Sequence, residues 1–88
     1  MTSFRKLTAR EELRMPRLAA GLFPHLLRQG LGWEDAVAVA HNAALLFLVL
    51  PEQDEVASPR EVLSLYSLGE IAGLCEEYRA FANGEMES

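Results

Sequence analysis

The run Trp33-Glu-Asp-Ala-Val-Ala-Val-Ala-His-Asn-Ala-Ala-Leu-Leu-Phe-Leu-Val-Leu50 determines how this chain folds. Glu34 and Asp35 would lie in the first turn of a helix, where the helix dipole stabilises negative charge. From Ala43 onward every residue is apolar, so a helix here is hydrophobic on all sides. Such a helix has to be buried on several sides, and we expect it to be the central helix of the core.

The same run leaves two questions of detail. One face of the expected helix is the row Trp33, Val37, Ala40, Ala44 and Leu48. Residues 46–50, the last five of the run, also suit a strand. Ala, Leu and Phe dominate the run, however, and no partner strand is evident, so a helix is favoured. The apolar part covers residues 43–50, whereas a membrane span needs about 20 apolar residues. We therefore expect a buried helix and no membrane association.

The length and composition indicate one small globular domain. The chain has 88 residues, half of them hydrophobic, which is too short for two domains and too apolar for disorder. We expect a single all-α domain over residues 1–88, a small orthogonal bundle of four to five helices around the buried central helix. Residues 1–7 and 84–88 are expected to be flexible. Because there is one cysteine and no apolar leader, we expect a reducing, cytoplasmic location.

Helix-capping patterns place the remaining elements. Thr8 and Glu11 form a capping box that opens a helix to about Met15. Pro16 and Pro24 interrupt the next stretch of the chain, and Pro16 either starts a new helix at its first position or kinks a continuing one. Two short helical pieces are expected there, ending at Gly30 or Gly32. Gly30 is the predicted left-handed cap. Ser58, Pro59 and Glu61 open a short helix over residues 59–65. Ser67 and Glu70 open a final helix that runs to about Ala82.

The final helix has the clearest periodicity. Leu68, Ile71, Ala72, Cys75, Tyr78 and Ala82 follow three- and four-residue steps, and Leu74 and Phe81 widen this face. Gly69 and Gly73 lie four residues apart on one side of it. They are either the smooth surface of a close helix contact or two tolerated glycines, and tolerance is favoured because that spacing is informative chiefly in membrane helices.

Charge is divided unevenly along the chain. Residues 1–30 carry six basic and two acidic side chains, a net +4, whereas residues 31–88 carry two basic and eleven acidic ones, a net −9. The two parts either attract each other, within a chain or between copies in a homo-oligomer, or are ordinary solvated faces. The total of −5 makes nucleic acid an unlikely partner, although the basic N-terminal third leaves a small nucleic-acid-associated regulator as the alternative function.

No catalytic, metal-binding or cofactor-binding pattern is present in the sequence. His25 and His41 fall in different predicted helices, and Cys75 lies on an apolar face where cysteine usually packs as a small hydrophobe. The acidic segment 52–55 lacks the glycine and the closing glutamate of a calcium loop. We therefore expect a protein that is not an enzyme and that binds no cofactor or metal.

The C-terminal third, Ser58-Pro-Arg-Glu-Val-Leu-Ser-Leu-Tyr-Ser-Leu-Gly-Glu-Ile-Ala-Gly-Leu-Cys-Glu-Glu-Tyr-Arg79, resembles small tail-assembly chaperones of tailed bacteriophages and prophages. Many of those end in Leu-Thr/Ser-x-x-Glu-Ile-x-x-Leu followed by an aromatic residue. The resemblance covers about the last 30 residues and implies a cytoplasmic, non-enzymatic protein that holds a tape-measure protein or tail-tube subunits. On this hypothesis the partner would contact Leu74, Tyr78 and Phe81.

Overall fold

The computed structural model describes residues 4–50 and 58–87, without the side chains of 85–87. The acidic segment of residues 51–57, like residues 1–3 and 88, lies outside the described part. The described residues form four helices and no strand, which confirms the all-α prediction: α1 (Ala9–Arg28), α2 (Trp33–Val49), α3 (Pro59–Leu65) and α4 (Leu68–Glu87). A fifth helix is not found in this part of the chain, and the orthogonal arrangement stays a prediction.

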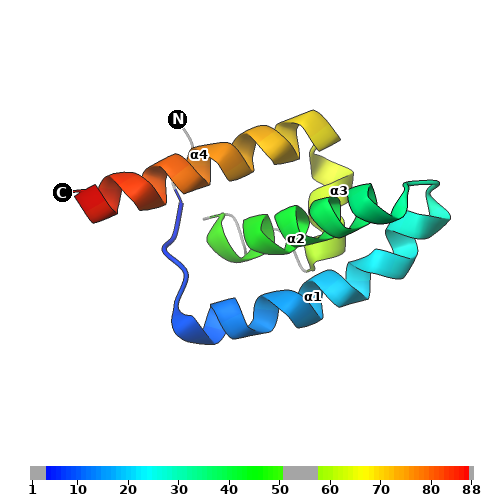
Figure 1. Ribbon diagram of the computed structural model, residues 1–88, viewed down its shortest axis with the longest axis horizontal. Helices are drawn as coiled ribbons and strands as arrows, with labels where there is room; N and C mark the ends of the chain where they lie inside the picture. Colours follow the sequence, from blue (N-terminus) through cyan, green and yellow to red (C-terminus); the bar gives the residue numbers. More distant parts are fainter. Residues whose placement is uncertain (1–3, 51–57, 88) are drawn as a thin grey trace.

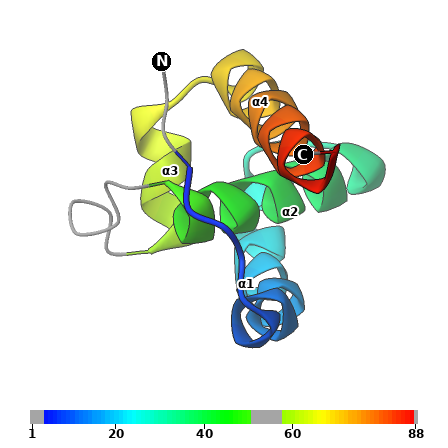
Figure 2. The ribbon, with the colours of Figure 1, turned by 90° about the vertical axis from the view of Figure 1, so that its left-hand side faces the viewer.

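Helix α2 lies between α1 and α4, which are on its opposite sides (Figures 1 and 2). Helix α3 packs against both α2 and α1. The segment Phe4–Thr8 descends from the side of α4 to the start of α1 and passes the C-terminal end of α2 (Figure 1). There the Arg5 backbone N–H donates to the Val49 carbonyl at 2.7 Å. The N-terminal segment therefore joins the two outer helices across the end of the central one.

The core is built around α2, as its uniformly apolar second half predicts. From Ala43 to Leu50 every residue is buried except Phe47, which is half-buried. In the first half of the helix the buried residues are Ala36 and Ala40, and small side chains there allow the neighbouring helices to approach. Within the predicted face, Ala40, Ala44 and Leu48 are buried, whereas Trp33 and Val37 are 70% and 38% exposed.

The expectation of two short helical pieces around Pro16 and Pro24 was wrong, and of the alternatives at Pro16 the continuing helix is the one found. Helix α1 is continuous from Ala9 to Arg28 with both prolines inside it. A proline in a helix interior costs about 3 kcal/mol, partly through the lost bond to the carbonyl four residues earlier. Pro16 and Pro24 have no N–H to donate to the carbonyls of Glu12 and Ala20, four residues earlier. All four residues are exposed, so water can bond to these carbonyls instead. Burial of Ala19, Leu22 and Leu26 in the core favours the continuous helix.

Gly30 closes α1 as predicted. Its φ is +95°, in the left-handed region that glycine adopts without strain. The Leu31 N–H donates to the Leu26 carbonyl at 3.3 Å and the Gly30 N–H to the Leu27 carbonyl at 3.1 Å, the pair of bonds that defines a Schellman motif. The chain thereby reverses within a few residues and α2 returns along α1.

The C-terminal helices begin where the caps predict. The Glu70 N–H donates to Ser67 Oγ at 3.1 Å and the Ser67 N–H to Glu70 Oε1 at 2.9 Å, a complete capping box. Helix α3 does begin at Pro59, but the Ser58 side chain makes no capping hydrogen bond. Helix α4 also runs beyond the predicted end at Ala82 to Glu87, through Asn83 and Gly84, although this dipeptide often marks a turn.

Candidate functional site

A shallow apolar groove runs between α1 and the first half of α2. Its hollow has a volume of about 570 Å³. The α1 side is formed by Pro16, Ala19, Ala20, Phe23, Pro24 and Leu27, and the α2 side by Trp33, Val37, Ala40 and His41. Nearly all of this surface is apolar, and the His41 imidazole is the one ionisable group among the lining side chains. The groove is therefore suited to apolar contact and poorly suited to acid–base chemistry.

Large apolar side chains in and beside the groove are exposed to solvent. Trp33 is 70% exposed and Leu13, one turn before Pro16, is 82% exposed. The Trp33 indole is held by an edge-to-face contact with Phe23, with ring centroids 4.5 Å apart. Exposed apolar patches of this kind mark interaction sites in globular proteins. We call Leu13 together with the groove residues the apolar strip.

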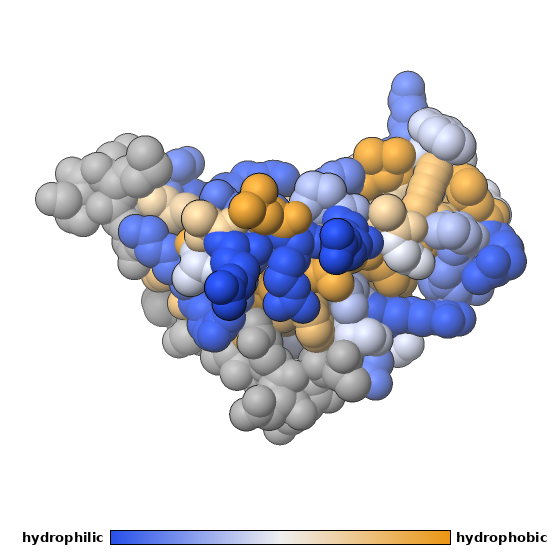
Figure 3. Space-filling view, turned by 90° about the horizontal axis from the view of Figure 1, so that it is seen from below, coloured by the Kyte–Doolittle hydropathy of each residue, from blue (hydrophilic) through white to orange (hydrophobic). Residues whose placement is uncertain are grey.

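Arginines follow one edge of the apolar strip. Arg10, Arg17 and Arg28 are exposed and lie seven and eleven positions apart, which puts them on one face of α1. Leu13 is three residues after Arg10 and four before Arg17, so the two kinds of side chain are neighbours on the helix surface. No ion pair within residues 4–50 and 58–87 involves these three arginines. Figure 3, seen from the side of α1, shows hydrophobic patches between hydrophilic side chains.

The three side chains predicted to bind a partner lie on the other side of the molecule. Leu74, Tyr78 and Phe81 are half-buried on α4. Phe4 packs on the two aromatics, edge-to-face with Tyr78 at 5.6 Å between centroids and tilted to Phe81 at 6.0 Å. The chain's own N-terminal segment therefore contacts this aromatic surface. Partner binding by these three residues stays a prediction.

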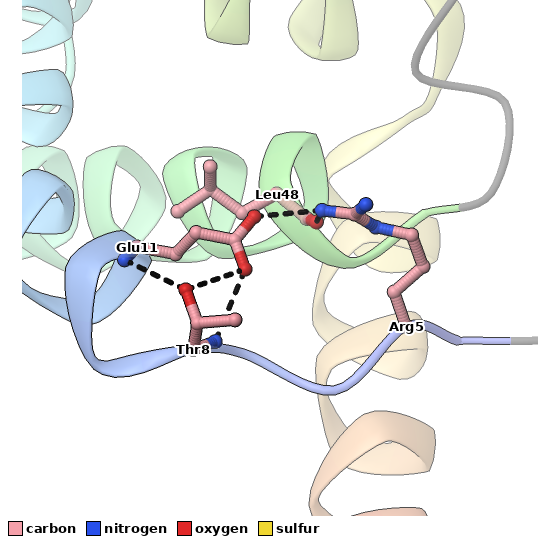
Figure 4. Close-up of polar contacts among 4 residues, drawn as sticks. All are labelled: Arg5, Thr8, Glu11 and Leu48. Carbon is pink, nitrogen blue, oxygen red and sulfur yellow. Dashed lines mark hydrogen bonds and ion pairs between the residues drawn. The ribbon is translucent and has the colours of Figure 1, made fainter.

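The N-terminal segment is anchored by a polar network around Glu11 (Figure 4). Glu11 Oε1 accepts from the Thr8 N–H at 3.0 Å and the Glu11 N–H donates to Thr8 Oγ1 at 3.2 Å, which confirms the predicted capping box. Glu11 Oε2 pairs with Arg5 Nη2 at 2.6 Å, and the same nitrogen donates to the Leu48 carbonyl at 3.2 Å. Hydrogen bonding from Thr8, with a smaller contribution from Arg5 and Arg14, lowers the pKa of Glu11.

Cys75 and the histidines form no common site. Cys75 is 1% exposed, its thiol donates to the Asn42 carbonyl at 3.6 Å, and burial raises its pKa to about 11, so it packs as a neutral side chain. His41 is exposed and donates from Nδ1 to the Val37 carbonyl at 3.0 Å, whereas His25 lines a different hollow near Tyr66. Among the residues that the structure describes, no three His, Cys, Asp or Glu side chains are grouped for metal binding.

The sequence reasoning missed the apolar strip. It grouped Trp33 and Val37 on one helix face with Ala40, Ala44 and Leu48, and a shared face does not show which of its residues are exposed. The available signal was the second apolar series on α1, Leu13, Pro16, Ala20, Pro24 and Leu27, which repeats at three- and four-residue steps beside the buried series. Two apolar series on one helix indicate two contact surfaces, and one domain of this size covers only one of them.

None of the three comparisons identifies a relative: no protein-family model matches the chain, and no curated protein or solved structure is significantly similar to it. No helix within the described residues is both long enough and apolar enough to cross a membrane.

Proposed function

We propose that this chain is a non-enzymatic helical protein-interaction module whose working surface is the apolar strip between α1 and α2. The observation that carries the proposal is the exposure of Trp33 in the apolar groove and of Leu13 one turn before the groove on α1, which the described residues leave uncovered. Tryptophan is enriched among the side chains that contribute most to protein–protein binding. A partner that covers this strip removes a large apolar area from water, which stabilises the complex.

A small-molecule site is a weaker explanation of the same groove. Sites for small ligands combine apolar walls with several converging polar groups that fix orientation. Here the lining offers little beyond the His41 imidazole, and the Nδ1 atom of that ring already bonds the Val37 carbonyl. The length of the strip along α1, about 21 Å from Leu13 to Leu27 at 1.5 Å per residue, also suits a segment of a protein.

The specific form of the proposal is a tail-assembly chaperone-like protein acting in the cytoplasm. Its support is the resemblance of residues 58–79 to such proteins of tailed phages and prophages. The partner would then be a tape-measure or tail-tube protein. The exposed apolar strip of this small helical protein would bind apolar segments of such a partner before assembly.

A nucleic-acid-associated regulator is the second candidate, and the group of exposed arginines near the start of α1 is the observation that favours it. Arg10, Arg14 and Arg17 line one exposed depression together with Leu13 and Leu18. The chain as a whole nevertheless carries −5, which opposes binding to phosphates. A gel shift with duplex DNA at low salt separates the two candidates, and a salt-sensitive shift abolished by Arg14→Glu would favour the regulator.

The proposal is tested by co-expression with the long helical protein encoded nearest to this chain, followed by affinity capture. Val37→Asp introduces a charge into the groove at a position 38% exposed, so the fold should tolerate it. Ala38→Asp adds the same charge at the next, exposed residue outside the groove lining and serves as the matched control. We expect Val37→Asp to abolish capture and Ala38→Asp to preserve it. Equal capture by both variants, or none by the unmodified chain, would contradict the proposal.

A further inference from the structure

We propose that the apolar strip receives a single amphipathic helix of about four turns whose apolar stripe is flanked by acidic residues on the side of α1. This inference rests on the proposed function and specifies the chemistry of the partner. Three observations carry it: the backbone that lines the groove, the length of the strip, and the arginines along its edge.

The backbone around the groove excludes binding by strand addition. Both walls are helices, α1 and α2, whose backbone groups are engaged in their own hydrogen bonds, apart from the carbonyls of Glu12 and Ala20 that face the two prolines. An extended peptide laid here would find no row of free N–H and C=O groups to pair with, and its own would stay unpaired as water is excluded. A helix satisfies its backbone internally and presents only side chains, so a helix is the form of segment that this groove can take.

The dimensions of the strip fix the length of that helix. Leu13 and Leu27 are about 21 Å apart along α1, which corresponds to about 14 residues of a helix lying alongside. Trp33 and Val37 continue the apolar surface on the second wall. A partner with apolar residues at three- and four-residue steps over four turns would cover Leu13 at one end and the Trp33 indole at the other.

The arginines determine which charges the partner carries. Arg10, Arg17 and Arg28 form a positive edge along the strip on α1, whereas the first turn of α2 carries the two exposed acids Glu34 and Asp35. Complementary charges at the edge of an interface select partners and accelerate association. A helix with glutamates or aspartates along the flank that meets α1 is favoured, and one with lysines there is repelled.

A second copy of this chain paired antiparallel through the strip fits it less well. Two copies that pair antiparallel about a two-fold axis through their strips bring the same edge of each copy together. Arg10, Arg17 and Arg28 of one copy would then face the same arginines of the other, with like charges opposed. Self-association through this surface would therefore contradict the inference.

The experiment uses the single tryptophan of the chain, Trp33, as the reporter. Two designed peptides of about 16 residues, both free of tryptophan and capped at their ends, share one apolar stripe of leucines. One carries glutamates along the flank and the other carries lysines at the same positions. Each is titrated into the full-length chain at low salt while the Trp33 emission is followed, because cover by apolar side chains moves indole emission to shorter wavelength.

We expect the glutamate-flanked peptide to shift the emission and to bind about tenfold or more tightly than the lysine-flanked one, with the difference shrinking at high salt. Arg17→Glu should reduce or reverse that preference, whereas Arg79→Glu, an exposed arginine on α4, should leave it unchanged. Equal binding of both peptides would overturn the acidic-partner inference while leaving the groove as a binding surface.

Two further results would overturn the inference in distinguishable ways. If neither peptide binds but capture of the natural partner is lost in Val37→Asp, the groove is the working surface and the partner is not an acid-flanked helix. If Trp33 emission shifts with concentration of the chain alone, a second copy occupies the strip. Failure of the proposed function itself is recognised separately, by equal capture with Val37→Asp and Ala38→Asp.

Discussion

Glu11 is the residue that connects the N-terminal segment to two helices. One oxygen of its carboxylate caps the start of α1 through Thr8, and the other pairs with Arg5, which also bonds the Leu48 carbonyl at the end of α2. The Arg5 guanidinium thus lies where the dipole of α2 is negative, and the Glu11 carboxylate lies where that of α1 is positive. The Glu11–Arg5 pair therefore helps to hold the segment that carries Phe4 onto α4, together with the bonds from Arg5 to the Val49 and Leu48 carbonyls.

Substitution of Glu11 by Gln should lower the free energy of unfolding by about 1 kcal/mol, since it removes the charge and weakens the cap. The measurement is urea denaturation followed by circular dichroism at neutral pH. Arg10→Gln, an exposed neighbour without an ion pair among the described residues, is the control and should stay within about 0.5 kcal/mol of the unmodified chain. An unchanged midpoint for Glu11→Gln would contradict the role given to this network.

The same residue predicts a dependence on pH. The folded chain lowers the pKa of Glu11 below its ordinary value of 4.5, so the ionised form favours folding. The resulting stability is fully present above about pH 4.5 and is lost as pH falls through the lowered pKa. Denaturation series between neutral and acidic pH should show a smaller acid-induced loss in Glu11→Gln than in the unmodified chain. Parallel pH profiles would show that the carboxylate does not contribute.

Small residues on α2 determine how closely the helices pack. Ala43 is fully buried, with 0% exposure, at the point where the helix becomes apolar on all sides. Ala43→Leu should destabilise the fold by about 1–3 kcal/mol, because the extra methylenes have no space in a closely packed core. Ala38→Leu places the same side chain on the exposed side of this helix and should change stability by less than about 0.5 kcal/mol. Thermal denaturation of both variants tests the comparison, and equal midpoints would contradict it.

Two glycines are expected to respond to alanine in opposite directions. A Cβ on Gly73 would meet no atom within 4 Å inside the α4 helix, so Gly73→Ala should raise stability by about 0.5–1 kcal/mol. Gly30 also has space but a φ of +95°, so Gly30→Ala should lower stability by about 1 kcal/mol. Chemical denaturation measures both. Because the described residues make no close contact at Gly73, a destabilising Gly73→Ala would indicate that the chain packs differently there.

The helices were predictable wherever local signals agree with burial. The boxes Thr8–Glu11 and Ser67–Glu70, the left-handed cap Gly30 and the apolar end of α2 each depend on residues close in sequence, and each is found as predicted. Pro16 and Pro24 mislead because their cost is local, whereas the burial of Leu22 and Leu26 against α2 that offsets it is tertiary. Propensity within one helix does not contain that information.

The candidate site was less predictable for a related reason. Periodicity identifies apolar faces but does not say which face the domain itself covers. Leu74, Tyr78 and Phe81 were assigned to a partner, yet Phe4 from the other end of the chain packs on the two aromatics. Trp33 and Val37 were placed on the same helix face as the buried Ala40, yet they lie outside the core. Only the arrangement of α1 and α4 on opposite sides of α2 distinguishes the covered surface from the open one.

The openness of the apolar strip in the free chain is tested by quenching of the Trp33 fluorescence with acrylamide, a neutral water-soluble quencher. With 70% of the side chain exposed, the folded chain should be quenched at least about half as efficiently as the urea-unfolded chain, and equally at low and high protein concentration. Strong protection of Trp33 in the folded chain would show that the strip is already covered. Protection that appears only at high concentration would show that a second copy covers it, and either result would contradict a surface open to a partner.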